Sequence, residues 1–184
     1  MSPAKELQAI GQKMTPFSLP LLGGSGNRSL SSYLEGKRGV VVIFWSGVCS
    51  HCLRYDEYMN SFTSRHPELG MVAIASRHGE TPELIAKTVA ERKLTYPILY
   101  DAGAAVAKQW YTPQTPRVFL IASNEMLPYR GAIDNFKSAT DPDFAEYLEP
   151  AIGQFLAGEP IAKPETASFG CAIMSVYYIL PKAL

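Results

Sequence analysis

The sequence predicts an α/β sandwich with a mixed central sheet. Two apolar runs that do not alternate with polar residues, 40–45 and 71–76, are typical of central strands buried on both faces. Two further runs, 117–123 and 126–132, are separated by a short turn and predict an antiparallel hairpin. Parallel strands connected by helices therefore come first along the chain, and an antiparallel pair comes later.

The other elements follow from local signals in the order of the chain. Residues 17–20 ("FSLP") and the Gly-rich turn after them predict an N-terminal β-hairpin. A Thr or Asp cap followed by Pro predicts helix starts at Thr81 and Asp141. The helices are expected at 49–62, 81–93, 102–111 and 141–158, with a short extended segment at 96–101. Pro150 should kink or break the last helix.

Composition limits the class of protein. The chain has 184 residues, 47% hydrophobic and 18% charged, which fits one soluble globular domain. Seventeen basic and seventeen acidic residues give no net charge, so neither nucleic acid nor a membrane is expected as a partner. We expect the domain at 1–158 and a Pro-rich extension, 159–184, packed on it. No signal peptide or membrane span is recognised, so a cytoplasmic location is expected. A trimmed export signal would leave the same sequence, which keeps a periplasmic location open.

A Cys-x-x-Cys pair, Cys49 and Cys52, lies where the strand at 40–45 should give way to a helix. A thiol at a helix N-terminus favours the thiolate, and a second thiol one turn later can close a disulfide with it. This pattern predicts a redox couple with Cys49 as nucleophile and Cys52 as resolving cysteine. His51 lies between them and, when protonated, would stabilise the Cys49 thiolate; the alternative is an exposed turn residue with little effect.

A zinc site and a pair of inert thiols are the alternatives to a redox couple. A zinc site needs two more ligands, and neither the third cysteine nor His66 and His78 stand at a ligand-like spacing. No metal is therefore expected. A pair of inert buried thiols would not explain the position at a strand-to-helix turn.

Four segments resemble the redoxin branch of the thioredoxin superfamily, which includes alkyl-hydroperoxide-reductase/thiol-specific-antioxidant-like proteins and thiol–disulfide oxidoreductases. They are "GQKMTPFSLP", "VVIFWSGVCSHC", "LTYPILYDAGAAVAKQWYTPQTPRVFLI" and "YRGAID". The resemblance implies a thioredoxin-like three-layer sandwich and an enzyme that needs no cofactor beyond its Cys49–Cys52 disulfide. Implied partners are a protein or small-molecule disulfide and a thiol donor such as a thioredoxin or glutathione system.

The resemblance also implies roles for residues around the pair. Pro116 would follow a cis peptide bond and face the cysteines, and Thr115 would offer backbone groups to an extended substrate. An ordinary trans Pro at a strand start is the alternative. Substrate contacts are further expected from the four residues Trp45, Ser46, Val48 and Arg117.

The chain departs from thioredoxin at two places. Val48 stands where thioredoxin has Trp before the first cysteine, and Ile43 stands where it has a buried Asp. That Asp helps to deprotonate the resolving thiol. Asp56, one helical turn after Cys52, or Glu57 could replace it as proton acceptor; a solvated helix face is the alternative.

Two other functions stay open on the sequence. Ser46 occupies the Thr/Ser place of the peroxiredoxin motif, but Val42 replaces its Pro, and Arg117 would have to supply the activating cation. A redox-dead interaction module is the third reading. Cys171, in "SFGCAI", is either a third redox thiol or a small buried hydrophobe.

Overall fold

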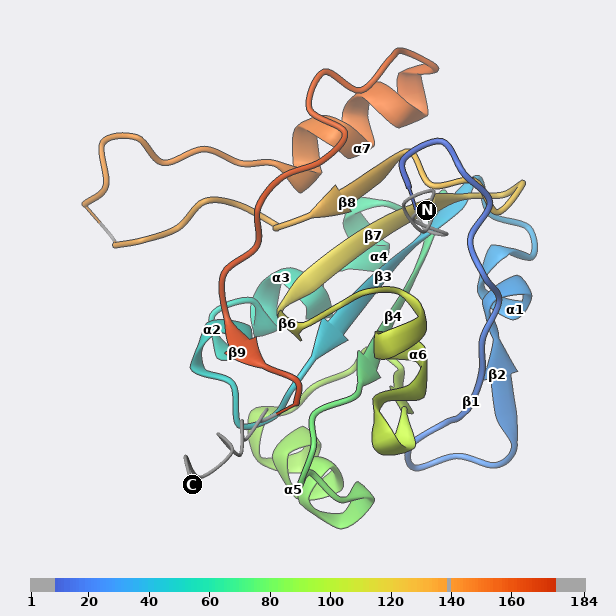
Figure 1. The fold of residues 1–184 in the computed structure, drawn as a ribbon, viewed down its shortest axis with the longest axis vertical. Coiled ribbons are helices and arrows are strands. Elements are labelled where there is room, and N and C mark those ends of the chain that lie inside the picture. The colour runs from blue at the N-terminus through green and yellow to red at the C-terminus, as the bar shows by residue number, and fades with distance from the viewer. Residues whose placement is uncertain (1–8, 139, 175–184) are drawn as a thin grey trace, which may run out of the picture.

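The computed structural model describes residues 9–138 and 140–174 and shows helices on both sides of a twisted sheet (Figure 1). In this part of the chain the central sheet has five strands in the order β5-β4-β3-β7-β8. Their bounds are Gly39–Trp45 (β3), Leu69–Ala75 (β4), Ile98–Tyr100 (β5), Arg117–Ala122 (β7) and Tyr129–Gly131 (β8). β3 is parallel to β4 and antiparallel to β7, which confirms the mixed sheet.

Alternate residues of β3 divide the core into two layers, because successive side chains of a strand point to opposite faces. Ile43 and Trp45 point into the layer that also contains Cys49 and Cys52. Phe44 points into the other layer. The helices of the first layer are Ser50–Leu53 (α2), Asp56–Asn60 (α3), Phe62–Arg65 (α4), Pro82–Arg92 (α5) and Leu148–Ala157 (α7). Leu30–Leu34 (α1) and Ala105–Gln109 (α6) cover the second.

The N-terminal hairpin is present. Ser18–Pro20 (β1) pairs antiparallel with Asn27–Ser29 (β2), and the Gly-rich turn joins them. Leu19 and Phe17 pack into the second core layer, so the hairpin closes the face of the sheet that α6 also covers.

The expected helix 49–62 is not continuous, which corrects the prediction. Tyr55 has backbone angles outside the helical range (φ −100°, ψ 10°) and separates α2 from α3, and Ser61 (φ −91°, ψ −4°) lies between α3 and α4. The Ser61 hydroxyl donates to the Glu57 carbonyl at 2.9 Å, a side-chain bond that competes with the helix ladder. Apolar spacing alone cannot report such interruptions.

Of the two helices expected at 81–93 and 102–111, the first agrees with the prediction and the second is shorter than predicted. Thr81 caps α5 by accepting the Leu84 N–H at 3.3 Å, as expected. The helix expected at 102–111 is reduced to α6 and a 3₁₀ turn, Ala102–Ala104, because Gly103 and Ala104 have positive φ (68° and 56°).

The last helix begins later in the chain than predicted. Asp141 does not cap it; α7 begins at Leu148. Residues 143–145 instead bind Asn135, whose side chain accepts the Ala145 N–H at 2.6 Å and donates to the Asp143 carbonyl at 2.7 Å. Pro150 is the third residue of α7, where its missing N–H has no intrahelical partner to lose, so no kink is needed.

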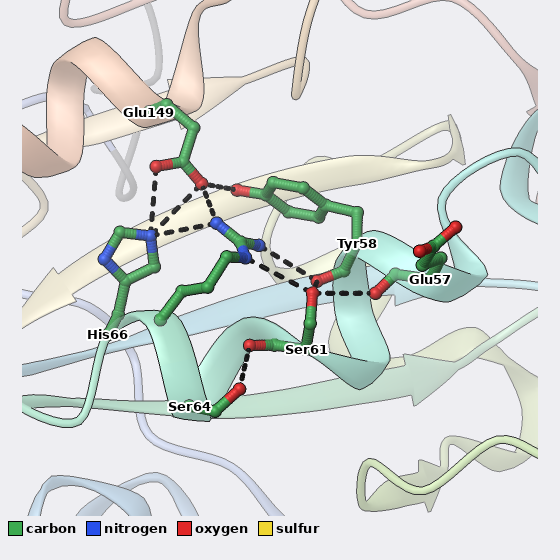
Figure 2. A network of polar contacts seen from close by, with 7 residues as sticks. Glu57, Tyr58, Ser61, Ser64, His66 and Glu149 are labelled. Atoms are coloured by element: carbon green, nitrogen blue, oxygen red, sulfur yellow. Dashed lines mark hydrogen bonds and ion pairs between the residues drawn. The ribbon is translucent and has the colours of Figure 1, made fainter.

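A polar network attaches α7 to the helices after the cysteine pair (Figure 2). The Glu149 carboxylate accepts from the Tyr58 hydroxyl at 2.7 Å, from Arg65 at 2.7 Å and from His66 at 3.0 Å. Burial alone would raise the pKa of Glu149, but the hydrogen bonds from these three residues lower it. α7 is therefore held through its first turn.

The Pro-rich extension returns along β8 and then along β6, Gln114–Thr115, where Cys171–Ala172 (β9) pairs with it. The Thr166 hydroxyl forms a hydrogen bond with the Tyr129 hydroxyl at 2.8 Å and accepts one from the Ala132 N–H at 3.0 Å. The apolar residues 175–180, expected to dock on the body, lie outside the described residues. No helix in the described ranges has the length and hydropathy needed to cross a bilayer.

Candidate active site

The two cysteines of the Cys-x-x-Cys pair lie just beyond the carboxyl end of β3, in the middle of the sheet. Cys49 is the N-cap of the four-residue helix α2, and the Cys52 N–H donates to the Cys49 carbonyl at 3.0 Å. Both thiols are free and buried, with 1% of Cys49 and 0% of Cys52 exposed. The strand-to-helix position expected from the sequence is confirmed.

The environment shifts the pKa values of the two thiols in opposite directions. The hydrogen bond from Cys52 is the largest cause that lowers the pKa of Cys49 to about 4; burial opposes it, and Cys171 and Thr115 assist. Burial raises the pKa of Cys52 well above its ordinary value, and the Cys49 thiolate raises it further. At neutral pH the pair therefore holds one thiolate, on Cys49, and one thiol, on Cys52.

A second segment faces Cys49 from 66 residues away. The Cys49 thiol donates to the Thr115 carbonyl at 3.3 Å, and the Thr115–Pro116 peptide bond is cis, as the resemblance implies. Both residues are buried. Thr115 thus contributes a backbone carbonyl directly to the nucleophile.

Cys171 belongs to the same site. In β9 it stands opposite Thr115, whose carbonyl oxygen lies 3.3 Å from the Cys49 sulfur, and Cys171 helps to lower the pKa of Cys49. Burial raises the pKa of Cys171, as does the Cys49 thiolate, while the nearby Arg77 guanidinium acts in the opposite direction. The structure therefore brings the third cysteine to the pair, and it adds Arg77, which the sequence analysis did not identify.

The loop between β3 and α2 is held by two charged residues that the sequence analysis also missed. Glu80 accepts the Gly47 N–H at 2.8 Å, and Arg92 donates to the Gly47 carbonyl at 3.0 Å. Glu80 is only 6% exposed. These contacts span 33 and 45 residues, so no local pattern could have indicated them.

Asp56 lies near Cys52 but is engaged by another partner. Its carboxylate forms a two-point ion pair with Arg92, including an Nε–Oδ2 contact of 2.7 Å. Burial lowers the pKa of Arg92, but Asp56 and the Cys52 sulfur outweigh it and raise the pKa. The positive charge beside Cys52 is thus Arg92, whereas Glu57 lies exposed on α3.

An exposed rim surrounds the cysteines. Val48 is 63% exposed, and His51 is exposed on α2. His51 and Pro116 lie on the same small pocket, whose other lining residues include Tyr55, Asp134, Phe136 and Phe169. Tyr55 donates to Asp134 at 2.5 Å across this pocket.

Three residues expected to contact substrate do not line this pocket. Trp45 and Ser46 are fully buried, and the Ser46 carbonyl accepts the Cys49 N–H at 3.3 Å, so both belong to the packing around the cysteines. The Arg117 guanidinium lies 5.8 Å from the ring centroid of Phe119, which belongs to the core layer on the face opposite Cys49. Among residues 9–138 and 140–174, no three His, Cys, Asp or Glu side chains are grouped as metal ligands.

Comparison with known proteins places these features in a family. Residues 10–133 match the sequence model of the AhpC/TSA family. The thiol-disulfide oxidoreductase ResA of Halalkalibacterium halodurans is 30% identical over 118 residues, which cover 64% of this chain and 65% of that protein. The alignment thus spans slightly under two thirds of that relative's length.

Solved structures share the fold. A hypothetical protein from Sinorhizobium meliloti 1021 matches with a TM-score of 0.79 and 26% identity, over 90% of this chain and 93% of its own. The peroxidoxin BcpB from Mycobacterium tuberculosis matches with a TM-score of 0.59 and 19% identity, over 80% and 94%. These matches confirm the expected thioredoxin-like sandwich.

Proposed function

Because the chain belongs to the AhpC/TSA family, we propose that it is a thiol–disulfide oxidoreductase with Cys49 as nucleophile and Cys52 as resolving cysteine. The observation that carries this proposal is the opposite shift of the two pKa values. Cys49 is a thiolate at neutral pH and can attack, while Cys52 keeps its proton until it is needed.

In the first step the Cys49 thiolate attacks one sulfur of a substrate disulfide. A Cys49–substrate mixed disulfide forms, the substrate S–S bond breaks, and the departing thiolate takes a proton from solvent. Formation of the mixed disulfide removes the negative charge from Cys49. Two of the three causes that raise the pKa of Cys52, the hydrogen bond and the charge of Cys49, then disappear.

In the second step Cys52 loses its proton and attacks the Cys49 sulfur, which releases the second substrate thiol and forms the Cys49–Cys52 disulfide. The Arg92 guanidinium stabilises the Cys52 thiolate, and Asp56, paired to Arg92, is the candidate acceptor for its proton. The substrate gains two electrons and two protons. An external thiol donor, such as a thioredoxin or glutathione system, returns the enzyme to the dithiol.

Reduction of insulin disulfides with dithiothreitol as donor tests the proposal. We expect wild type to accelerate precipitation of the insulin chains and Cys49→Ser to give only the uncatalysed rate. Equal rates for the two proteins would overturn the proposal. They would favour a redox-dead interaction module if Cys49 also resisted alkylation at pH 7.

Peroxide reduction is the second candidate, and the Cys49 thiolate is the observation that favours it. Peroxide consumption that survives Cys52→Ser but not Cys49→Ser would identify it. The position of Arg117, whose guanidinium lies near Phe119 of the other core layer, favours disulfide exchange.

The direction of electron flow follows from the reduction potential of the Cys49–Cys52 couple against its compartment. Equilibration with glutathione buffers would measure that potential. A value near that of thioredoxin supports a reductant in the cytoplasm; a much higher value supports an oxidant outside it.

A further inference from the structure

The strand β9 occupies the backbone edge next to the cis-proline. Thr115 stands opposite Cys171 and Gln114 opposite Ala172, and the Ile173 N–H donates to the Pro113 carbonyl at 2.9 Å. The His78 N–H in turn donates to the Ile173 carbonyl at 2.8 Å. An extended substrate peptide would add to this same edge. The chain therefore fills the edge with its own strand (Figure 1).

Close packing holds this strand at the nucleophile. Gly170 passes so near Thr115 that an added Cβ would collide with the Thr115 carbonyl oxygen, the atom that accepts the Cys49 thiol. Gln114 binds Ser168 on the same segment. With β9 in place, Cys49 is only 1% exposed, so its nearest reaction partners are other thiols of this chain.

Cys171 has what an internal exchange partner needs. It stands opposite Thr115, whose carbonyl oxygen lies 3.3 Å from the Cys49 sulfur. Burial and the Cys49 thiolate raise the pKa of Cys171. Once Cys49 is held in a disulfide, the contribution of its charge is gone, and the Arg77 guanidinium still favours the Cys171 thiolate. Its strand position opposite Thr115 is where a substrate residue would be presented to Cys49.

We propose that Cys171 is a third redox thiol that competes with Cys52 for Cys49, so that the oxidised protein exchanges between a Cys49–Cys52 and a Cys49–Cys171 disulfide. The inference rests on the proposed function, because both need an exchange-competent Cys49. In the internal step Cys171 releases its proton to solvent and its thiolate attacks the Cys49 sulfur, the Cys49–Cys52 bond breaks, and Cys52 leaves as a thiolate that takes up a proton. The step replaces one disulfide of the chain by another and leaves the number of disulfides unchanged, so no oxidant or reductant is required.

The same attack resolves mixed disulfides. When Cys49 carries a substrate, the Cys171 thiolate can displace the substrate thiol and form the Cys49–Cys171 disulfide. A protein that lacks Cys52 would therefore still release its substrate.

Oxidised glutathione as probe, followed by intact-mass and disulfide-peptide mapping, tests this. Cys52→Ser should accumulate the Cys49–Cys171 disulfide, whereas Cys52→Ser/Cys171→Ala should accumulate about tenfold more of the Cys49–glutathione adduct. Equal adduct in the two proteins, without a Cys49–Cys171 peptide, would overturn this inference and leave the proposed function intact. No adduct in either would overturn both.

Displacement of β9 gives a second readout that keeps Cys171. In the Cys52→Ser background, Gly170→Ala should raise the adduct toward the double-variant level, because its Cβ collides with Thr115. Gly153→Ala is the matched control, since no atom lies within 4 Å of a Cβ there. An unchanged adduct with Gly170→Ala, in a protein whose circular dichroism is native, would contradict the docking of Cys171 by β9.

Discussion

The thiol of Cys49 donates a hydrogen bond to the carbonyl oxygen of Thr115 across 3.3 Å. This contact joins the loop after β3 to the strand that precedes the cis-proline. It positions the nucleophile against a backbone edge, whereas the pKa of Cys49 is lowered by Cys52, Cys171 and the Thr115 side chain.

The first prediction concerns the reactivity of Cys49 with pH. Its pKa of about 4 predicts that the rate of alkylation by iodoacetamide stays near its maximum from pH 8 down to about pH 5. At lower pH the rate should fall, because Cys49 becomes protonated. Intact-mass kinetics would measure the profile. A midpoint near that of a free thiol, about 8.5, would contradict the assigned environment.

Cys52→Ala tests the cause of that shift. The hydrogen bond from Cys52 is the largest contribution, so its removal should move the midpoint up by about one unit or more. Ser50→Ala, an exposed change between the two cysteines, should leave the midpoint in place.

The second prediction concerns His51. A charged imidazole beside Cys49 stabilises the thiolate, and hence the reduced form, so His51→Gln should lower the reduction potential. We expect a decrease of roughly 30 mV, which is about 1.4 kcal/mol for a two-electron couple. Glutathione-buffer titration measures it. A potential that stays constant or rises would assign His51 to the exposed rim alone.

The third prediction concerns Arg92. Its guanidinium binds Asp56 and the Gly47 carbonyl, and its pKa is raised in part by the Cys52 sulfur. Arg92→Gln should slow the attack of Cys52 on the mixed disulfide by about tenfold, because the Cys52 thiolate loses the cation that interacts with it. Rapid-quench detection of the mixed disulfide would show it accumulating.

A matched control lies on the same helix. Lys87→Gln on the exposed face of α5 should leave the mixed-disulfide lifetime unchanged. Asp56→Asn tests proton transfer separately: it should slow resolution while leaving the alkylation of Cys49 as in wild type. Normal resolution in both Arg92→Gln and Asp56→Asn would exclude this pair from the mechanism.

The fourth prediction concerns stability. Glu149 has a lowered pKa in the folded protein, so its contribution is present above the ordinary glutamate pKa and is lost as pH falls through the folded value. Glu149→Gln should lower the free energy of unfolding by about 1 to 3 kcal/mol at pH 7, and by much less below about pH 4. Urea unfolding at both pH values measures this, with exposed Glu159→Gln as control. An equal loss at both pH values would show that charge is not the cause.

Patterns of burial predicted the framework well. The uninterrupted apolar run at 40–45 became β3, and the cap and proline at Thr81 and Pro82 began α5. The helix ends were harder to predict, because they depend on contacts with distant segments. Asn135 holds residues 143–145 out of the helix that Asp141 was expected to start, and no pattern within 141–158 contains that information.

The sequence predicted those residues of the site that belong to a characteristic spacing or motif. Cys49 and Cys52 are separated by two residues, and Thr115–Pro116 matches a known motif, so both were found. Glu80, Arg92 and Arg77 come from loops and helix faces, where a charged residue is ordinary, and only the fold brings them to the cysteines. Trp45, which was expected to contact substrate, is fully buried in the core layer that also contains Cys49 and Cys52.

The lowered pKa of Cys49 also links folding to redox strength. Since the contacts from Cys52, Thr115 and Cys171 exist only in the folded chain, ionisation of Cys49 stabilises that chain. This contribution to the free energy of folding is fully present above the pKa of a thiol in the unfolded chain. It is lost as the pH falls from that value to about 4. Oxidation of Cys49 removes the charge and forfeits the same gain. The part of the conformational stability that comes from ionisation of Cys49 therefore also contributes to oxidising power, and a substitution that removes this contribution lowers both.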